Sequence, residues 1–295
     1  MKKISVSRRF FLAGAYAILV IAALLCVLPF INLLAISFSD KTAVAAGRVT
    51  FLPIQTTTAS YRYLISDHQF LRSFGTSLLR VIIGVSVQLL IMLPAAFSLS
   101  HSKDQLFGRS FYAVYFVITM IVSGGMIPSY LVVAKLGLIG SFWSMILPMA
   151  VPVYNMIILM NFMRSLPKEL EEAAMIDGAT PMKTLISVVI PISKAGIATV
   201  MLFCIISHWN SWFDGMIYLD SVSQYPLQSY LYAQLRSIDR MMREMETNYE
   251  ALAKLVNMRT TRAAMMFIGA LPMLIVYPFL QKYFTKGLVL GSVKG

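Results

Sequence analysis

Residues 168–194 read KELEEAAMIDGATPMKTLISVVIPISK, a polar stretch between two long apolar segments of the chain. Three of its acids fall near a predicted helix start, where the helix dipole favours negative charge. Pro167 fits the first position of that helix, where no backbone N–H is needed. Gly178 tolerates the left-handed backbone that ends a helix, and Thr180-Pro181 fits the cap and first residue of another. The stretch therefore predicts two short helices joined at Gly178 and held against a membrane face.

The composition of the whole chain is that of a membrane protein. Of 295 residues, 58% are hydrophobic and 13% are charged, whereas soluble domains carry about 25% charged residues. Basic residues account for the net charge of +12, and on a multi-spanning protein they set topology and face anionic lipid. We therefore expect membrane lipid, and no nucleic acid, as a partner. Cys26 and Cys204 lie inside apolar runs, so the sequence supports neither a disulfide nor a thiol-ligated metal.

Apolar runs predict an all-α membrane protein with six transmembrane helices. Four basic residues precede the first run, which is longer than the core of a signal peptide, so we expect an uncleaved span with its N-terminus inside. Each run approaches or exceeds the about 20 residues that cross a bilayer. The spans are expected at about residues 10–36, 73–100, 110–134, 136–163, 195–217 and 262–285.

Six spans place both termini in the cytoplasm. Arg80 falls within the second span, so it must face the bundle interior or reach the interface. The polar segment 37–72 is expected outside. The remaining parts are a cytoplasmic N-terminus at 1–9, a cytoplasmic loop at 164–194, an external loop at 219–261 with apolar residues at helical spacing, and a cytoplasmic tail at 286–295.

The polar stretch also carries a specific signature. Glu172-Ala173-Ala174 is followed after three residues by Gly178, and after nine more by Val188-x-Ile190-Pro191. This pattern resembles the EAA signature of bacterial ABC importer permeases, with mild apolar changes at Val188 and Ile190. The similarity extends over nearly the whole chain, including the tail at 286–295. It points to the carbohydrate-uptake, maltose-type family, and most closely to its LplC/YtcP-type oligosaccharide permeases.

The resemblance implies the type I ABC importer permease fold and a non-catalytic subunit in the cell membrane that moves a carbohydrate, expected to be an oligosaccharide. It implies three kinds of protein partner: a second, homologous permease, a cytoplasmic ATPase dimer and an extracellular substrate-binding protein. We expect no cofactor and no metal. The loop at 164–194 would couple ATPase motion to alternating access, through Glu172, Ala173, Ala174, Asp177, Gly178, Pro181 and Pro191.

The end of the fifth span suggests a place for the sugar. Asn210 and Asp214 are four residues apart and share a helix face, beside an aromatic face. Aromatic rings next to amides and acids suit sugars, although tryptophan at a span end is also typical of an interfacial anchor. Polar residues on the fourth span are expected to face the interior as well. The candidate pathway residues are Trp209, Asn210, Trp212, Asp214, Tyr154 and Asn155.

Two other functions remain to be compared with this interpretation. A secondary, ion-coupled transporter acting without an ATPase would be expected to show internal repeats and a central pair of ionisable residues. Only Arg80 and Asp214 are candidates for such a pair, and neither is central. An intramembrane enzyme would need a catalytic constellation, and the chain contains no phosphate-binding loop, H-E-x-x-H or G-x-S-x-G motif.

Overall fold

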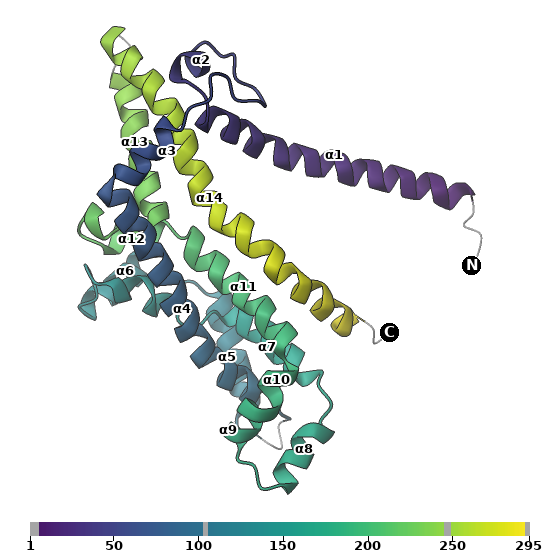
Figure 1. The fold of residues 1–295 in the computed structure, drawn as a ribbon. Helices are drawn as coiled ribbons and strands as arrows, with labels where there is room; N and C mark the ends of the chain where they lie inside the picture. The colour runs from purple at the N-terminus through teal and green to yellow at the C-terminus, as the bar shows by residue number, and fades with distance from the viewer. Residues whose placement is uncertain (1–5, 103–105, 245–248, 293–295) are drawn as a thin grey trace. The chain divides into compact units, whose positions relative to one another are not determined.

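The structure is a computed structural model that describes residues 6–102, 106–244 and 249–292, so the ends of the predicted N-terminus and tail lie outside the described residues. Every regular element in those ranges is a helix. The chain divides into two compact units. The first combines Met1–His68 with Ala233–Leu271, and the second combines Gln69–Tyr232 with Pro272–Gly295. Figure 1 labels the helices along the chain.

The first unit begins with α1 (Val6–Ser37), whose most apolar stretch has none of its residues buried. A polar segment with two short helices follows, α2 (Lys41–Ala45) and α3 (Ala59–Ser66). Asp40 begins α2 by accepting a hydrogen bond from the Thr42 amide at 2.9 Å, which satisfies one free donor of the first turn. A small core of Ala35, Ala43, Val44 and Val49 holds this segment to the end of α1. The unit also contains most of α13 (Leu227–Glu244) and the first half of α14 (Tyr249–Ser292).

The second unit is built around α4 (His68–Ser100), α7 (Val153–Arg164) and α11 (Lys194–Asn210), which share one apolar core. Met92 and Ala96 of α4, Leu159 of α7, and Val200 and Cys204 of α11 are fully buried there. Its other elements are α5 (Arg109–Ile121), α6 (Met126–Lys135), η1 (Phe142–Met145), η2 (Leu147–Met149), α8 (Glu169–Ile176), α9 (Pro181–Thr184), η3 (Leu185–Val189), α10 (Ile190–Ile192), α12 (Phe213–Tyr218) and η4 (Val222–Gln224).

Three helices of the described chain are long and apolar enough to cross a membrane: Arg8–Ser37, His68–Ser100 and Met258–Phe279. Three bent pairs raise the number to six if each pair is one span. These are Arg109–Ile121 with Met126–Lys135, Phe142–Met149 with Val153–Arg164, and Pro181–Ile192 with Lys194–Asn210. The apolar membrane character is therefore clear, and the count of six spans stays a prediction.

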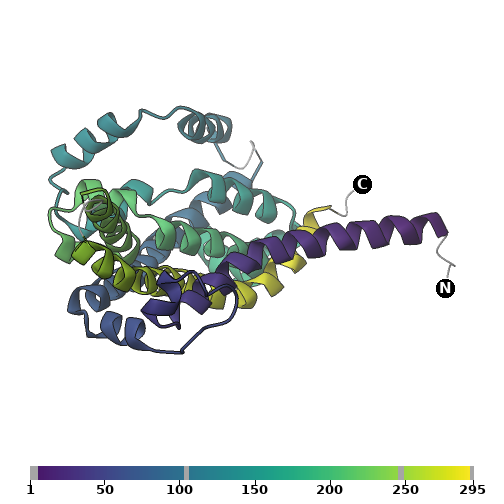
Figure 2. The same cartoon turned by 90° about the horizontal axis from the view of Figure 1, so that it is seen from above.

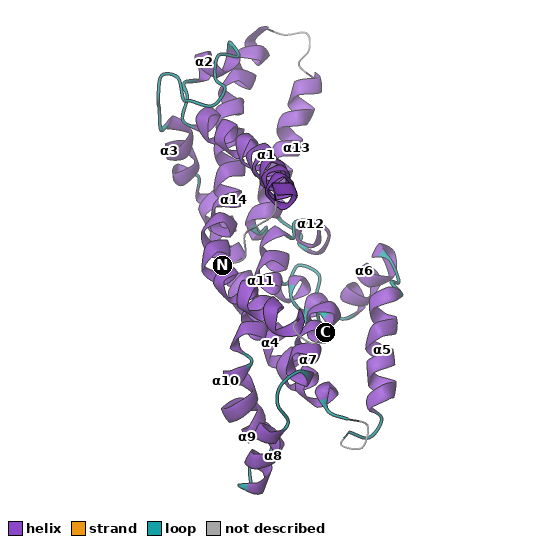
Figure 3. Ribbon diagram, turned by 90° about the vertical axis from the view of Figure 1, so that its right-hand side faces the viewer, coloured by secondary structure: helices purple, strands orange, loops and turns teal. Residues whose placement is uncertain are grey.

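The third predicted span, 110–134, contains a sharp break instead of one continuous helix. α5 and α6 meet at 114°, a bend that is visible in Figures 2 and 3. Gly125 lies at the break with φ of +84°, outside the helical region, and glycine adopts such angles without a steric penalty. The apolar run continues across this glycine, which is why the sequence suggested one helix.

The fourth predicted span, 136–163, is helical in a different way. Its first half contains the 3-10 turns η1 and η2, and only Val153–Arg164 is a regular α-helix. Pro148 and Pro152 fall in this transition, and each lacks the N–H that an α-helix interior requires. The predicted external loop at 219–261 is largely helical, since η4, all of α13 and the start of α14 lie within it.

Candidate functional site

The loop at 164–194 contains the two short helices that the sequence predicts. Helix α8 begins at Glu169, two residues after Pro167, and has Glu169, Glu171 and Glu172 in its first turn. Gly178 follows the helix with φ of +74°. Its amide donates to the Met175 carbonyl at 3.0 Å, and the Ala179 amide donates to the Ala174 carbonyl at 2.9 Å. This pair of bonds is a Schellman motif, in which a glycine satisfies the last carbonyls of a helix.

The second short helix begins as predicted and then changes its winding. The Thr180 hydroxyl accepts a hydrogen bond from the Lys183 amide at 3.4 Å, and Pro181 takes the first position of α9. The chain continues as a π-helix, η3, which ends directly before the short helix that contains Pro191. Proline cannot donate to the preceding turn, and single π turns of this kind are frequent at functional sites.

One side of this loop is anchored in the apolar core of the second unit. Leu185 and Val189, both on η3, are 3% and 0% exposed and pack in the same cluster as Leu159 and Met163 of α7. The helices α9 and α10 contact η3, and so does α8. A displacement of α8 would therefore act directly on residues that are closely packed against α7, because packed interiors transmit strain rather than absorb it.

The other side of the loop exposes apolar side chains. Isolated exposed apolar residues are ordinary, but a group of them on one polar segment is typical of a protein contact. Of the predicted coupling residues, Ala174 is half-buried and the other six are exposed. The large apolar side chains that are exposed here are Leu170, Met175, Ile176, Met182 and Ile186, of which Ile176 is the most exposed at 87%.

A contact that the sequence did not indicate connects α8 to the end of α4. The Nε2 atom of His101 lies 3.3 Å from a Glu171 carboxylate oxygen. The other ring nitrogen, Nδ1, lies 2.8 Å from the Phe97 carbonyl oxygen, to which it can only donate. Nε2 therefore carries a proton for Glu171 when the imidazole is doubly protonated. The two residues are 70 positions apart in the chain, so no local spacing could reveal the pair.

A largely buried ion pair links α4 to the start of α12. Arg80 is 0% exposed, and its guanidinium makes a bidentate contact with the Asp214 carboxylate. The same guanidinium donates to the Ser211 carbonyl at 3.2 Å. One Asp214 oxygen also accepts from the Ser211 hydroxyl at 2.8 Å and from the Gly215 amide at 2.9 Å. Arg80 therefore faces the interior, one of the two positions that the sequence allowed.

The other candidate pathway residues do not gather into one cavity of the described structure. Trp209 is 2% exposed and meets Phe74 edge-to-face, with ring centroids 5.9 Å apart. Trp212 stacks on Tyr232 at 4.0 Å. The amide of Asn155 is buried and donates to Cys204 Sγ at 3.4 Å. Tyr154 and Asn210 are exposed. A role for these residues in sugar passage stays a prediction.

The chain is similar in sequence to known permease proteins. No protein-family profile matches the chain. It is 36% identical over 282 residues to the polygalacturonan/rhamnogalacturonan transport system permease protein YtcP of Bacillus subtilis, covering 95% of this chain and 96% of that one. It is also 38% identical over 270 residues to protein LplC of the same organism, covering 91% and 90% of the two chains.

A solved structure agrees with these relatives. The fold matches a chain in the crystal structure of a bacterial ABC transporter involved in the import of the acidic polysaccharide alginate, with a TM-score of 0.83 and 31% identity. The match covers 96% of this chain and all of that one, 100%. Identity above 30% over nearly the whole length, together with the same helical fold, identifies the chain as a permease subunit of the carbohydrate-importing ABC transporter family.

Proposed function

We propose that the loop at 164–194 is the element through which this permease receives the motion of its ATPase. The observation that carries the proposal is its two-sided construction. Ile176 and Met182 are exposed on one side, while Leu185 and Val189 are buried in the core on the other. A segment built in this way can bind a second protein and pass a displacement of that protein into α7 and α11, without first deforming itself.

The local geometry supports a rigid coupling element. The Schellman motif at Gly178 and the Thr180 cap hold α8 and α9 at a defined angle, and the His101–Glu171 contact ties α8 to the end of α4. ATP-driven closure of an ATPase dimer would then bias the bundle between two packed arrangements, inward-facing and outward-facing. The coupling residues in this proposal are those of the EAA signature together with Asp177 and Pro181.

The proposed topology has six spans, with each bent helix pair counted as one. Both termini and the loop at 164–194 are then cytoplasmic, and the polar segments at 37–72 and 219–261 are external. A second homologous permease would complete the membrane pathway, and a cytoplasmic ATPase dimer and an extracellular substrate-binding protein would complete the importer. α1 supports a membrane or subunit environment, because its most apolar stretch has none of its residues buried.

The substrate class that we propose is an acidic oligosaccharide. The names of YtcP and of the alginate transporter both specify polysaccharides that contain uronate units. We extend that class to this chain because its similarity to both proteins covers nearly its whole length. Trp209, Asn210, Trp212, Asp214, Tyr154 and Asn155 remain the candidate pathway residues.

Replacement of Gly178 tests the coupling proposal. A Cβ at Gly178 would meet no atom within 4 Å, so the effect of Gly178→Val comes from its φ of +74°. A left-handed backbone costs an ordinary residue about 1–2 kcal/mol, and the local turn should change while the rest of the unit stays folded. We expect the variant to insert and to pair with its partner permease. It should lose the ATPase on co-purification, or lose the stimulation of ATP hydrolysis by the loaded binding protein.

A matched control is available in the same unit. Gly137 has φ of +67°, and a Cβ there would also meet nothing within 4 Å. Gly137→Val should carry a similar backbone penalty but keep the ATPase and its stimulation. Equal ATPase retention and equal stimulation in both variants would show that the loop at 164–194 is not the coupling element.

A further inference from the structure

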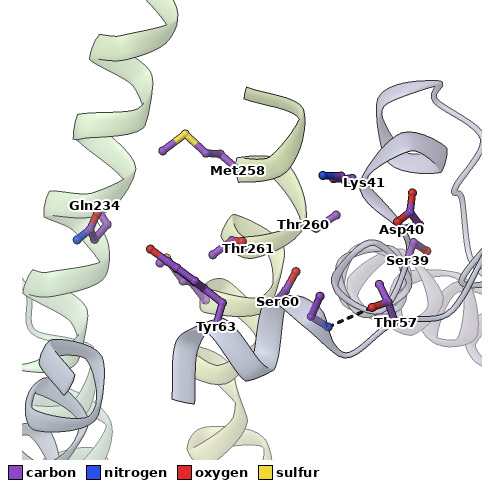
Figure 4. A pocket seen from close by; sticks show the side chains of 12 residues that line it. Ser39, Asp40, Lys41, Thr57, Ser60, Tyr63, Gln234, Met258, Thr260 and Thr261 are labelled. Carbon is purple, nitrogen blue, oxygen red and sulfur yellow. Dashed lines mark hydrogen bonds between the residues drawn. The ribbon is translucent and has the colours of Figure 1, made fainter. Parts of the chain in front are cut away.

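A cavity of the first unit lies apart from the loop at 164–194 in sequence and is not lined by any of the candidate pathway residues. It has a volume of about 460 Å³, within the range of about 300–1,000 Å³ that small-molecule sites occupy. Figure 4 shows the side chains around it. Its walls come from the segment after α1, from α2 and α3, and from α13 and α14, so residues far apart in the sequence form it. The polar lining consists of Ser39, Asp40, Lys41, Thr57, Ser60, Tyr63, Gln234, Thr260 and Thr261.

Ser60 contributes a hydroxyl to this wall. Ser60 is 6% exposed, and in Figure 4 its oxygen points into the space beside Thr261. The neighbouring Thr57 hydroxyl accepts a hydrogen bond from the Ala59 amide at 3.2 Å. The Ser60 hydroxyl faces the space that a bound ligand would occupy.

The charged side chains that line the cavity indicate which kind of ligand it can bind. Lys41 lines the cavity and has no ion-pair partner among the residues that the structure describes. Asp40 is already engaged, because one of its oxygens accepts from both the hydroxyl and the amide of Thr42. These bonds hold the pKa of Asp40 below its ordinary value, so this carboxylate stays ionised and acts as an acceptor. Lys41 also contributes to that lowered pKa, and it is the cationic side chain of the lining that can meet an anion.

The remaining walls offer apolar contact beside the hydroxyls. Tyr63 presents an aromatic ring and a phenolic hydroxyl, and Met258 and Met265 contribute thioether side chains. A sugar ring has apolar C–H faces and hydroxyl edges, and it needs both kinds of contact at once. An aromatic face combined with several hydroxyls and one ammonium matches a sugar ring that carries a carboxylate.

From this arrangement we propose that the cavity binds one uronate unit of the transported oligosaccharide, with Lys41 on its carboxylate, Tyr63 on its ring face and Ser60 on a hydroxyl. The proposal rests on the acidic oligosaccharide class and the external position of this segment given under the proposed function. It adds a sugar contact in the first unit, apart from the candidate pathway residues near Asp214.

Binding measurements on the assembled importer without its binding protein test the proposal. The probes are a trisaccharide of uronate units and the same trisaccharide with its carboxyls reduced to alcohols. Lys41→Gln should weaken binding of the uronate probe by about tenfold, the effect of losing one charge-assisted hydrogen bond, and leave the reduced probe unchanged. Tyr63→Leu should weaken both probes several-fold. Lys135→Gln, on α6 of the second unit and not among the residues that line the cavity, is the matched control and should bind both probes as the parent does.

Three results would overturn the proposal. The first is equal affinity of the parent, Lys41→Gln and Tyr63→Leu for the uronate probe. The second is no binding of either probe to the parent at millimolar concentration. The third is weaker association of the sugar-free binding protein with Lys41→Gln and Tyr63→Leu, which would make the cavity a protein contact.

Uptake of the uronate trisaccharide by the complete importer separates this inference from the proposed function. If the parent imports the uronate trisaccharide and all variants bind it equally, the cavity assignment is wrong and the proposed function stands. Import of a neutral oligosaccharide but not the uronate probe removes the acidic substrate class, and the cavity assignment with it.

Discussion

Charge is buried in one part of the second unit, while apolar surface is exposed in another part of the same unit. Between α4 and α12, Arg80 is fully buried and pairs with Asp214, which is 15% exposed. In the loop at 164–194, the apolar side chain of Ile176 is 87% exposed. Each arrangement reverses the usual rule that charges lie outside and apolar groups inside.

The two regions differ in where the interaction partner of the unusual side chain is found. The guanidinium of Arg80 finds a carboxylate and a backbone carbonyl within the chain, so the ion pair forms without another subunit. Ile176 has no such cover among the described residues, and we propose that the ATPase provides it. Substitutions in the first region should therefore affect the folded permease itself, and substitutions in the second should affect its assembly.

Removal of one ion partner should give the largest effect on stability. Asp214→Ala leaves a buried, uncompensated guanidinium, and breaking a buried pair in this way costs about 3–5 kcal/mol. We expect a sharp fall in the yield and thermal stability of the detergent-purified complex. The double variant Arg80→Met/Asp214→Leu should recover most of that loss, because it removes both charges. An Asp214→Ala complex as stable as the parent would show that the pair is not important for stability.

Overpacking beside the ion pair should have an intermediate effect. A Cβ at Gly84 on α4 would lie 2.5 Å from the ring of His208, and His208 is 1% exposed. Gly84→Ala should therefore cost about 1–3 kcal/mol, the usual penalty for overpacking a core. The measurement is thermal unfolding of the purified complex. Gly75→Ala is the control on the same helix, because a Cβ there meets nothing within 4 Å. Equal stabilities of the two variants would contradict the tight α4–α11 contact.

Substitution of an exposed apolar residue in the loop should have the smallest effect on stability. Ile176→Asp removes no buried contact, so the stability of the permease pair should change by less than about 0.5 kcal/mol. The ATPase should nevertheless be lost on co-purification, because an aspartate would be buried without a partner in the proposed contact. Ile65→Asp, at a residue on α3 that is 63% exposed, is the control and should retain the ATPase. ATPase loss in both variants, or in neither, would remove the contrast between the two regions.

The local structure of the loop at 164–194 was predictable because its signals are carried by adjacent residues. Gly178 ends a helix and Thr180-Pro181 begins another, as the structure shows. These features depend on backbone angles and on bonds within a few residues. The predicted start of α8 was two residues too early, because Pro167 precedes the helix instead of opening it.

The interruptions of the predicted spans were not predictable from apolar runs. The 114° bend between α5 and α6 and the 3-10 turns before α7 lie within runs that read as continuous. Hydropathy measures the solvent that a segment prefers, not the direction of its axis. Gly125 and Pro148 allow a break, but many glycines and prolines in membrane helices leave the helix intact.

The sequence by itself determined the class of this protein: an all-helical membrane chain, its EAA signature and its family. Apolar runs and a contiguous motif carry that information, and both survive without any knowledge of the fold. Only the tertiary structure decided that Arg80 meets Asp214 across 134 positions, that His101 reaches Glu171, and that Lys41, Ser60 and Tyr63 share a cavity with residues of α13 and α14. The physical reason is that such contacts depend on which helices pack together, and side-chain spacing along one segment does not specify its neighbours.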